Sequence, residues 1–86
     1  MYEVWLTRDA EQFYQGADDP LARRLNRCFD QLRRNPHDHA NIKRLKGPLA
    51  ACWRYRVGDW RVVYRVNEDE HVVTVLLIAH RSRAYG

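Results

Sequence analysis

The sequence of 86 residues is poor in cysteine, and this shortage excludes a disulfide-rich scaffold. Its two cysteines, Cys28 and Cys52, form neither a Cys-x-x-Cys pair nor a Cys/His zinc spacing. Both are expected to be buried free thiols that behave as small apolar side chains. His37 and His39 flank Asp38, but they lack a further ligand at a matching spacing. The sequence therefore predicts no metal site and no small-molecule cofactor.

A long apolar run is also missing from the chain. No stretch of about 18 apolar residues occurs, so a membrane-spanning helix is not expected. The first ten residues lack the basic and then apolar pattern of a secretory signal. A chain of this length predicts a single domain over residues 1–86. We expect a cytoplasmic protein without a membrane partner.

Acidic residues are scarce in the second half of the sequence. Residues 1–41 hold six Lys or Arg and seven Asp or Glu, whereas residues 42–86 hold nine basic and four acidic residues. A nearly neutral half joined to a basic half indicates a localised anion-binding surface. On charge alone, an ordinary solvated surface is the alternative.

Two helices are predicted in the first half of the chain, after a strand at residues 2–6. Thr7 offers a capping oxygen for the first helix, and Asp19-Pro20 starts the second with an Asp cap. Asn35-Pro36 ends the second helix. Each helix carries one apolar stripe: Ala10, Phe13, Tyr14 and Ala17 in the first, and Leu21, Leu25, Cys28, Phe29 and Leu32 in the second.

The second half of the chain has the pattern of strands. After an irregular segment at 36–49, strands are predicted over 52–57, 60–66 and 71–79. The last of these is apolar along its length and is expected to be central and buried on both faces. The order is strand, helix, helix, strand, strand, strand. It predicts an α+β fold, with two N-terminal helices packed on one face of a mostly antiparallel four-stranded sheet.

The hairpin in the second half predicts a cluster of arginines. A two-residue turn at Gly58-Asp59 places Arg56 opposite Arg61 and Arg54 opposite Val63, all on one face. Like charges directly opposite each other destabilise a sheet, whereas a bound phosphate would reverse that interaction. The planar fork of arginine grips two phosphate oxygens at once. A solvated outer face with splayed arginines is the alternative.

Two further segments add polar and charged groups to this cluster. The C-terminal segment follows the last predicted strand directly, and the loop at 43–46 precedes the hairpin. A frayed end and a solvated loop are the alternatives to binding in each case. The groups concerned are His80, Arg81, Arg83 and Tyr85 in the C-terminal segment, and Lys43, Arg44 and Lys46 in the loop.

Three segments together resemble the RelE/ParE toxin superfamily. They are NPHDHANIKRLKG, CWRYRVGDWRVVYRV and VLLIAHRSRAY. The shared pattern is an Asn-Pro after the second helix, a Leu-Lys-Gly, a strand of alternating Tyr and Arg, and a His-Arg before a final Tyr. The resemblance covers nearly the whole chain, and the order of elements agrees. It implies a bacterial toxin of a toxin–antitoxin pair with a RelE-like fold.

The resemblance also implies partners and functional residues. RelE-type members cleave messenger RNA in the ribosomal A site, which implies mRNA, the ribosome and a RelB-like cognate antitoxin as partners. ParE-type members share the fold and inhibit DNA gyrase, which is the alternative activity. An inactive module that only docks on RNA or an antitoxin is a third possibility. The functional positions of RelE-type enzymes fall here on Arg54, Arg56, Arg61, Arg81 and Tyr85.

Metal-independent RNA cleavage uses the 2′-OH of the substrate as nucleophile. On this hypothesis Arg56, Arg61 and Arg81 neutralise the scissile phosphate, and Tyr85 orients or deprotonates the 2′-OH. Well-known RelE-type enzymes carry lysines where this chain has Arg54 and Arg56. Arginine stays protonated and cannot act as a general base. Imidazole titrates near neutral pH, so His80 is a candidate acid or base, with a structural role as the alternative.

Overall fold

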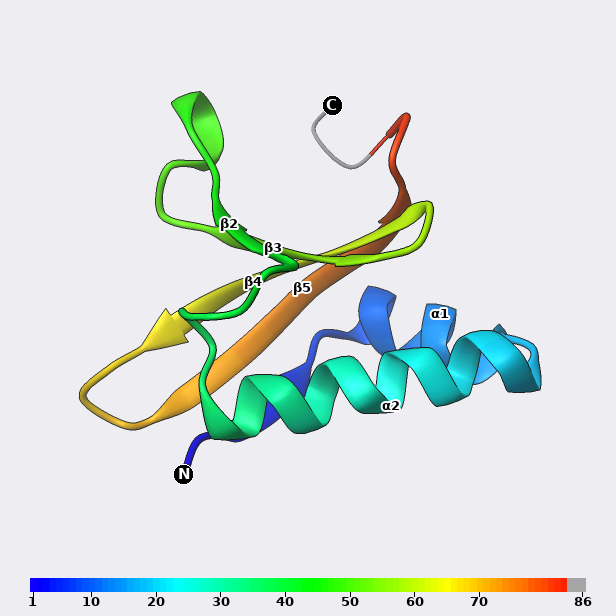
Figure 1. The fold of residues 1–86 in the computed structure, drawn as a ribbon, viewed down its shortest axis with the longest axis horizontal. Coiled ribbons are helices and arrows are strands. Elements are labelled where there is room, and N and C mark those ends of the chain that lie inside the picture. The colour runs from blue at the N-terminus through cyan, green and yellow to red at the C-terminus, as the bar shows by residue number, and fades with distance from the viewer. Residues whose placement is uncertain (84–86) are drawn as a thin grey trace.

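Two helices cover one face of a five-stranded sheet in the computed structural model, which describes residues 1–83 (Figure 1). The elements are β1 (Glu3–Leu6), α1 (Arg8–Gly16), α2 (Asp19–Arg34), β2 (Ile42–Arg44), the 3₁₀ turn η1 (Gly47–Leu49), β3 (Trp53–Val57), β4 (Trp60–Asn67) and β5 (Val72–His80). The strand order is β1-β5-β4-β3-β2, with only the β1–β5 pair parallel among the described strands. The predicted α+β class and the helix-on-sheet layering are confirmed.

The predicted count of four strands was wrong by one. The segment expected to be irregular contains β2, which pairs antiparallel with β3 through Ile42–Tyr55, Lys43–Arg54 and Arg44–Trp53. Three residues are too few to show the alternation by which a strand is recognised in a sequence. This strand therefore forms by pairing with the edge of β3, and it could not be predicted from its own residues.

Both helices begin at caps close to the predicted ones. The hydroxyl oxygen of Thr7 accepts a hydrogen bond from Ala10 N at 3.3 Å, as expected. The second helix is capped one residue earlier than predicted, because the side chain of Asp18 accepts from Leu21 N at 3.0 Å and Asp19 is already helical. Within residues 1–83, neither helix has the length and apolar character needed to cross a membrane.

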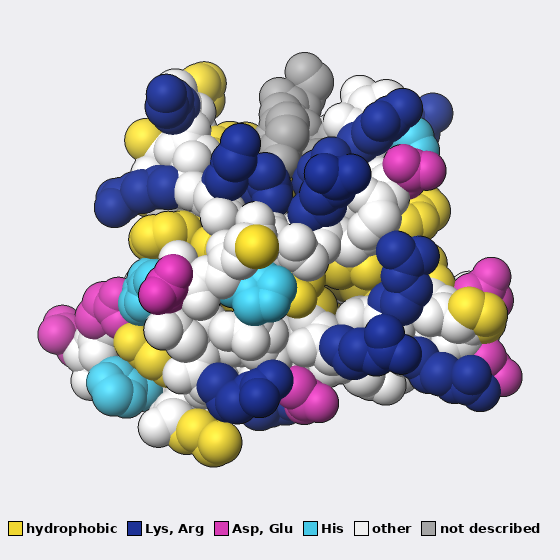
Figure 2. Space-filling model, viewed as in Figure 1, with side chains coloured by type: hydrophobic (Ala, Val, Ile, Leu, Met, Phe, Trp, Pro, Cys, Tyr) yellow, Lys and Arg dark blue, Asp and Glu magenta, His cyan; other side chains and the backbone are white. Residues whose placement is uncertain are grey.

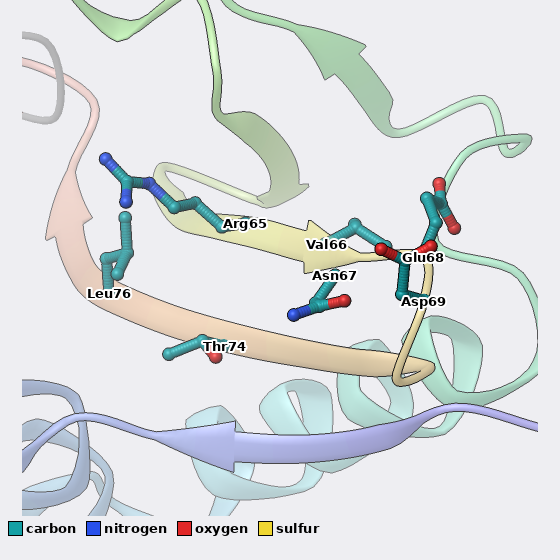
Figure 3. Close-up of a pocket in the computed structure, with 7 residues that line it drawn as sticks. All are labelled: Arg65, Val66, Asn67, Glu68, Asp69, Thr74 and Leu76. Carbon is teal, nitrogen blue, oxygen red and sulfur yellow. The ribbon is translucent and has the colours of Figure 1, made fainter.

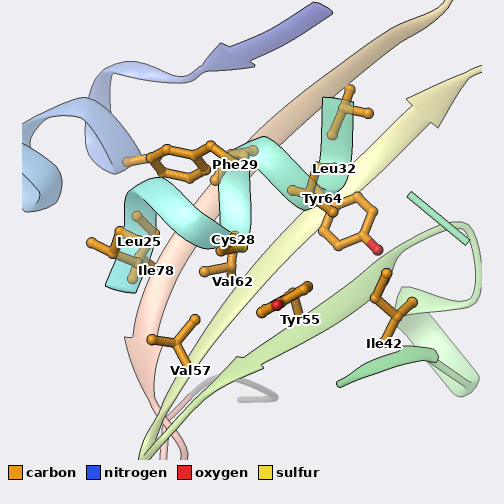
Figure 4. Packing of buried hydrophobic residues seen from close by; sticks show 13 residues of the cluster. Leu25, Cys28, Phe29, Leu32, Ile42, Tyr55, Val57, Val62, Tyr64 and Ile78 are labelled. Carbon is orange, nitrogen blue, oxygen red and sulfur yellow. The ribbon is translucent and has the colours of Figure 1, made fainter. Parts of the chain in front are cut away.

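The main core lies between the helices and the sheet (Figure 4). Leu25, Cys28 and Leu32 of α2 meet Val62 and Tyr64 of β4, and all five are fully buried. The core is therefore built from the apolar stripe of α2 and one face of the hairpin.

Both cysteines are buried free thiols, as predicted. Cys28 belongs to the main core, whereas Cys52 is buried outside it. Burial raises the pKa of the Cys28 thiol, which keeps it protonated and unreactive. The thiols therefore act as apolar side chains.

Within residues 1–83, neither α1 nor α2 packs on the opposite face of the sheet, which we call the open face (Figure 1). Strand β5 is paired on both sides, but only its helix-facing residues, such as Val73 and Val75, are buried. Thr74 and Leu77 are half-buried, so the expectation that this strand is covered on both faces was wrong. A run of apolar residues does not reveal whether a second layer exists to cover it.

Candidate functional site

The hairpin of β3 and β4 has the predicted register. Arg56 lies opposite Arg61, and Arg54 lies opposite Val63. Gly58 has a φ of 58°, and among residues 1–83 no non-glycine in this turn has a positive φ, as in a type II′ turn. This short turn determines the register, and the register determines which side chains share a face.

Four neighbouring cations on β2, β3 and β4 project from the open face of the sheet. Residues that alternate with them, Tyr55, Val57 and Val62, are buried in the main core, so the cations point away from the helices. Strand β2 adds a lysine to the predicted arginines, because its second residue lies opposite Arg54. The four are Lys43, Arg54, Arg56 and Arg61. Figure 2 shows Lys and Arg side chains gathered along the upper side of the molecule, over this face and the β3–β4 turn.

Backbone carbonyls fix three of the arginines in place. Arg54 donates from Nη1 to the carbonyl of Asn41 at 2.6 Å. Arg61 donates from Nη1 to Gly58 O at 3.0 Å, and Arg56 donates from Nε to the same oxygen at 3.4 Å. Two guanidinium groups bonded to one oxygen must lie side by side. Arg56 and Arg61 therefore converge on the turn instead of splaying apart, whereas Arg54 is held at Asn41.

Within residues 1–83, no carboxylate forms an ion pair with any of these four cations. The two ion pairs of this part of the chain join Arg33 to Asp30 at 2.8 Å and His37 to Glu68 at 2.7 Å. Neither pair involves a cation of the open face. An anion from outside the chain would therefore find positive charge that is already positioned and not neutralised.

The floor beside the cations is apolar. Val63 lies on the open face, between Arg54 and Leu77 in register, and only 1% of its surface is exposed. Charges held against a buried apolar residue are screened less than charges in open water. A phosphate bound here would feel a stronger attraction than one on a fully hydrated surface.

The C-terminal segment returns to the same turn. The backbone N–H of Arg81 donates to the carbonyl of Asp59 at 2.8 Å, which places this residue next to the two converging arginines. Arg83 donates its N–H to the carbonyl of His80 at 2.8 Å and is exposed. Tyr85, predicted to act on the 2′-OH, lies outside the described residues.

His80 lies on the other face of the sheet. It is in register with Trp60, and the two ring centroids are 5.5 Å apart. Trp60 in turn packs on Phe13 of α1 at 5.0 Å. The imidazole Nδ1 lies 3.1 Å from the hydroxyl oxygen of Ser82. This position, across the sheet from the arginines, is poorly suited to proton transfer at a phosphate bound between them.

The loop cations do not all share one face. Lys43 joins the open face. Arg44 lies opposite Trp53, with its guanidinium carbon 5.5 Å from the centre of that ring, and it donates to Ala50 O at 3.4 Å. Lys46 is exposed just before η1. Sequence reasoning grouped these three cations and could not separate them, because β2 was not recognised.

Another hollow of the surface lies at the other end of the open face (Figure 3). It encloses about 640 Å³ and is lined by Arg65, Val66, Asn67, Glu68, Asp69, Thr74 and Leu76. The guanidinium of Arg65 points toward Leu76 and away from the two carboxylates. Glu68 is used structurally, because Tyr2 donates to it at 2.7 Å and thereby holds the pKa of this carboxyl below its usual value. The mixed charge suits an anion less well than the arginine cluster does.

Comparison with known proteins gives a consistent family. A model described as "ParE toxin of type II toxin-antitoxin system, parDE" matches residues 4–85. The RelE toxin of Mycobacterium tuberculosis (strain ATCC 25618 / H37Rv) is 33% identical over 85 residues, which make up 98% of this chain and 86% of that protein. The sequence likeness therefore extends over nearly the whole chain.

Solved structures agree with this family. The archaeal RelE–RelB complex from Pyrococcus horikoshii OT3 contains a chain that matches with a TM-score of 0.81 and 28% identity, covering 96% of this chain and 98% of that one. The isolated RelE toxin of E. coli matches with a TM-score of 0.79 over 99% of this chain and 92% of that one; at 21% identity it supports the fold alone. Since the family model and the mycobacterial relative both span nearly the whole sequence, this chain belongs to the ParE toxin family of type II toxin–antitoxin systems, within the RelE/ParE superfamily.

Proposed function

We propose that this toxin is a metal-independent endoribonuclease that cleaves messenger RNA in the ribosomal A site and so stops translation. The observation that carries the proposal is the convergence of Arg56 and Arg61 on one carbonyl oxygen, with no carboxylate of residues 1–83 paired to either. Fixed positive charge of this kind stabilises a phosphate that gains negative charge in the transition state.

The reaction is an in-line displacement at phosphorus. The 2′-oxygen forms a bond to phosphorus, the bond to the 5′-oxygen breaks, and a cyclic phosphate and a free 5′-hydroxyl result. The 2′-hydroxyl loses a proton and the departing 5′-oxygen gains one. Arg56, Arg61 and Arg81 neutralise the non-bridging oxygens throughout. Arg54, hydrogen-bonded to Asn41 O, contacts the neighbouring backbone of the RNA.

The arginines cannot move the protons themselves, because guanidinium stays charged. Tyr85 would orient or deprotonate the 2′-hydroxyl, as the superfamily pattern implies. Correct placement of the RNA on the ribosome supplies the rest of the rate enhancement, since orientation alone accelerates such reactions strongly. We therefore expect free RNA to be cut more slowly than a message in the A site.

The proposed partner in the cell is a RelB-like antitoxin. The match from Pyrococcus horikoshii is a RelE–RelB complex. The basic face of this chain would attract a segment with acidic character, which would occupy the site and block RNA. The partner and the substrate would then compete for the same cations.

Gyrase inhibition is the second candidate function. It is favoured by the matching family model, whose description names a ParE toxin. The convergence of arginines with Arg81 beside them favours the nuclease, since an inhibitor that acts only by binding gyrase has no need of a preformed phosphate site.

Inducible expression in a bacterium, followed by primer extension on a reporter message, tests the proposal. Wild type should produce cuts in translated regions, and Arg61→Ala should abolish them. Arg65→Ala is the matched control, because this residue lies on the same strand and face but outside the cluster. Whole messages with DNA damage and filamentation would point to gyrase, and an absence of toxicity would point to a binding module.

A further inference from the structure

A second cluster of arginines surrounds a small cavity between α2 and the β3–β4 turn. The cavity has a volume of about 150 Å³. Arg24 and Arg27 reach it from α2, and Arg56 reaches it from β3. The remaining lining residues are Asn41, Tyr55, Val57 and Gly58. In Figure 2, Lys and Arg side chains over α2 extend toward those on the upper side of the molecule.

Gly58 brings the two clusters into contact. A Cβ atom at this position would lie 2.5 Å from Nη2 of Arg24, so the guanidinium rests directly against the glycine. The carbonyl of the same residue accepts from Arg56 and Arg61. Three guanidinium groups, from α2, β3 and β4, therefore meet at one residue of the turn.

This arrangement is unfavourable without a ligand. Three arginines, Arg24, Arg27 and Arg56, line a cavity that has no acidic lining residue, and the ion pairs of residues 1–83 involve none of them. Bringing like charges together costs free energy unless an anion lies between them. The cavity is small, which suits a single tetrahedral anion whose oxygens can accept from several guanidinium groups.

We propose that this cavity binds a backbone phosphate of the RNA next to the scissile one, with Arg24 and Arg27 as positioning residues. The proposal rests on the proposed function, and it extends the path of the RNA from the open face around the edge of β3. Arg56 belongs to both clusters, as expected where two successive phosphates of one strand are held.

An acidic segment of a protein is the other occupant that this chemistry would accept. Protein partners are held mainly by apolar or aromatic anchors inserted into pockets. Here the two apolar lining residues, Tyr55 and Val57, are buried in the main core, and the accessible walls are polar. A repeating phosphate chain needs no such anchor, so the cavity favours RNA.

The test measures binding of a single-stranded RNA oligonucleotide with 2′-O-methyl riboses, which cannot be cleaved, over a series of salt concentrations. Arg24→Gln/Arg27→Gln should weaken binding about tenfold at low salt, since charge-assisted hydrogen bonds are lost. The slope of log affinity against log salt should fall by roughly 0.7 for the one phosphate released. Arg23→Gln/Arg34→Gln, an equal change of charge at exposed positions on the same helix outside the cavity, should leave the slope unchanged.

The possible outcomes test the cavity proposal and the nuclease proposal separately. If both double variants show the same slope of log affinity against log salt and wild type still cleaves messages, the cavity proposal is wrong and the nuclease proposal stands. If RNA binding depends on Arg24 and Arg27 but the toxin leaves messages whole, the cavity proposal stands and the nuclease proposal is wrong. If Arg24→Gln/Arg27→Gln loses affinity for the antitoxin but keeps its affinity for RNA, the cavity binds a protein partner and the proposal is wrong. The proposal is also wrong if wild type fails to bind the oligonucleotide. Melting temperatures matching wild type establish that all variants fold.

Discussion

The two faces of the β3–β4 hairpin carry side chains of opposite character. On the helix side, Tyr55, Val57 and Val62 are buried in the core, whereas on the open side Arg56 and Arg61 lie beside each other. The backbone is shared, and only the alternation of side chains separates the two. One face therefore supplies stability, whereas the other gathers like charges that repel each other, as the proposed phosphate site would require.

This comparison predicts that substitutions on the two faces have different effects. A change on the helix face should lower stability and reduce activity only as a consequence. A change on the open face should reduce activity and leave stability equal or slightly higher, as is common where charge is gathered for function. Substitutions on each face can therefore test the difference.

Leu25→Ala should destabilise the toxin most. This side chain is fully buried under the sheet, and its removal leaves a cavity that costs about 2–5 kcal/mol. In a domain of this size each kcal/mol lowers the melting temperature by roughly 4–8 °C. Thermal unfolding followed by circular dichroism measures the effect. Ala22→Gly on the same helix is the comparison for loss of helix propensity alone, at about 1 kcal/mol.

Arg61→Ala should reduce cleavage about 100- to 1000-fold, because a fixed donor to the transition state is lost. The melting temperature should stay within a few degrees of wild type, since this side chain donates only to the part-buried carbonyls of Gly58 and Trp60 beside the turn. Single-turnover cleavage on programmed ribosomes measures the rate. A full rate in Arg61→Ala, or an equal loss in Arg65→Ala, would contradict the assignment.

Tyr64→Phe should cost about 1–3 kcal/mol of unfolding free energy. The buried hydroxyl donates to the carbonyl of Pro36 at 2.7 Å, and the change leaves that carbonyl without its partner. Urea denaturation provides the measurement. Tyr14→Phe removes an exposed hydrogen bond to Asn26 and should change stability by less than about 0.5 kcal/mol. Equal effects would mean that burial of the hydroxyl does not matter.

Arg56→Gln should stabilise the fold slightly, by about 0.2–1 kcal/mol, because it relieves repulsion from Arg61 across the hairpin. The gain should shrink at high salt, where exposed charges are screened. Urea midpoints at low and high salt measure it. A loss of stability that does not depend on salt would show that the paired arginines support the fold.

The pH dependence of stability should show a small contribution from Glu68. Its pKa is lowered chiefly by the hydrogen bond from Tyr2, with further help from His37 and His71. A carboxyl with a lowered folded pKa stabilises the fold above its unfolded pKa, and this contribution is lost as the pH falls through the folded value. Tyr2→Phe should therefore flatten the acid side of the profile of urea midpoint against pH. An unchanged profile would exclude this contact as its source.

Local features of this protein could be predicted from neighbouring residues alone. The caps, the apolar stripes and the stop at Asn35-Pro36 depend on neighbouring residues, so the helices were predicted to within a residue or two. The register of Arg56 opposite Arg61 also follows from a two-residue turn, which leaves no other alignment of the strands. The arginine cluster was visible in the sequence for that reason.

Features that depend on residues far apart in the chain appear only once the helices and the sheet are packed together. Lys43 joins the open face only because β2 pairs with β3, and His80 is directed to the helix side by its partner Trp60. Arg24 meets Gly58 only because α2 packs across the hairpin. Such contacts join segments whose separation carries no local signal, and their stability comes from burial and pairing that form when the layers assemble.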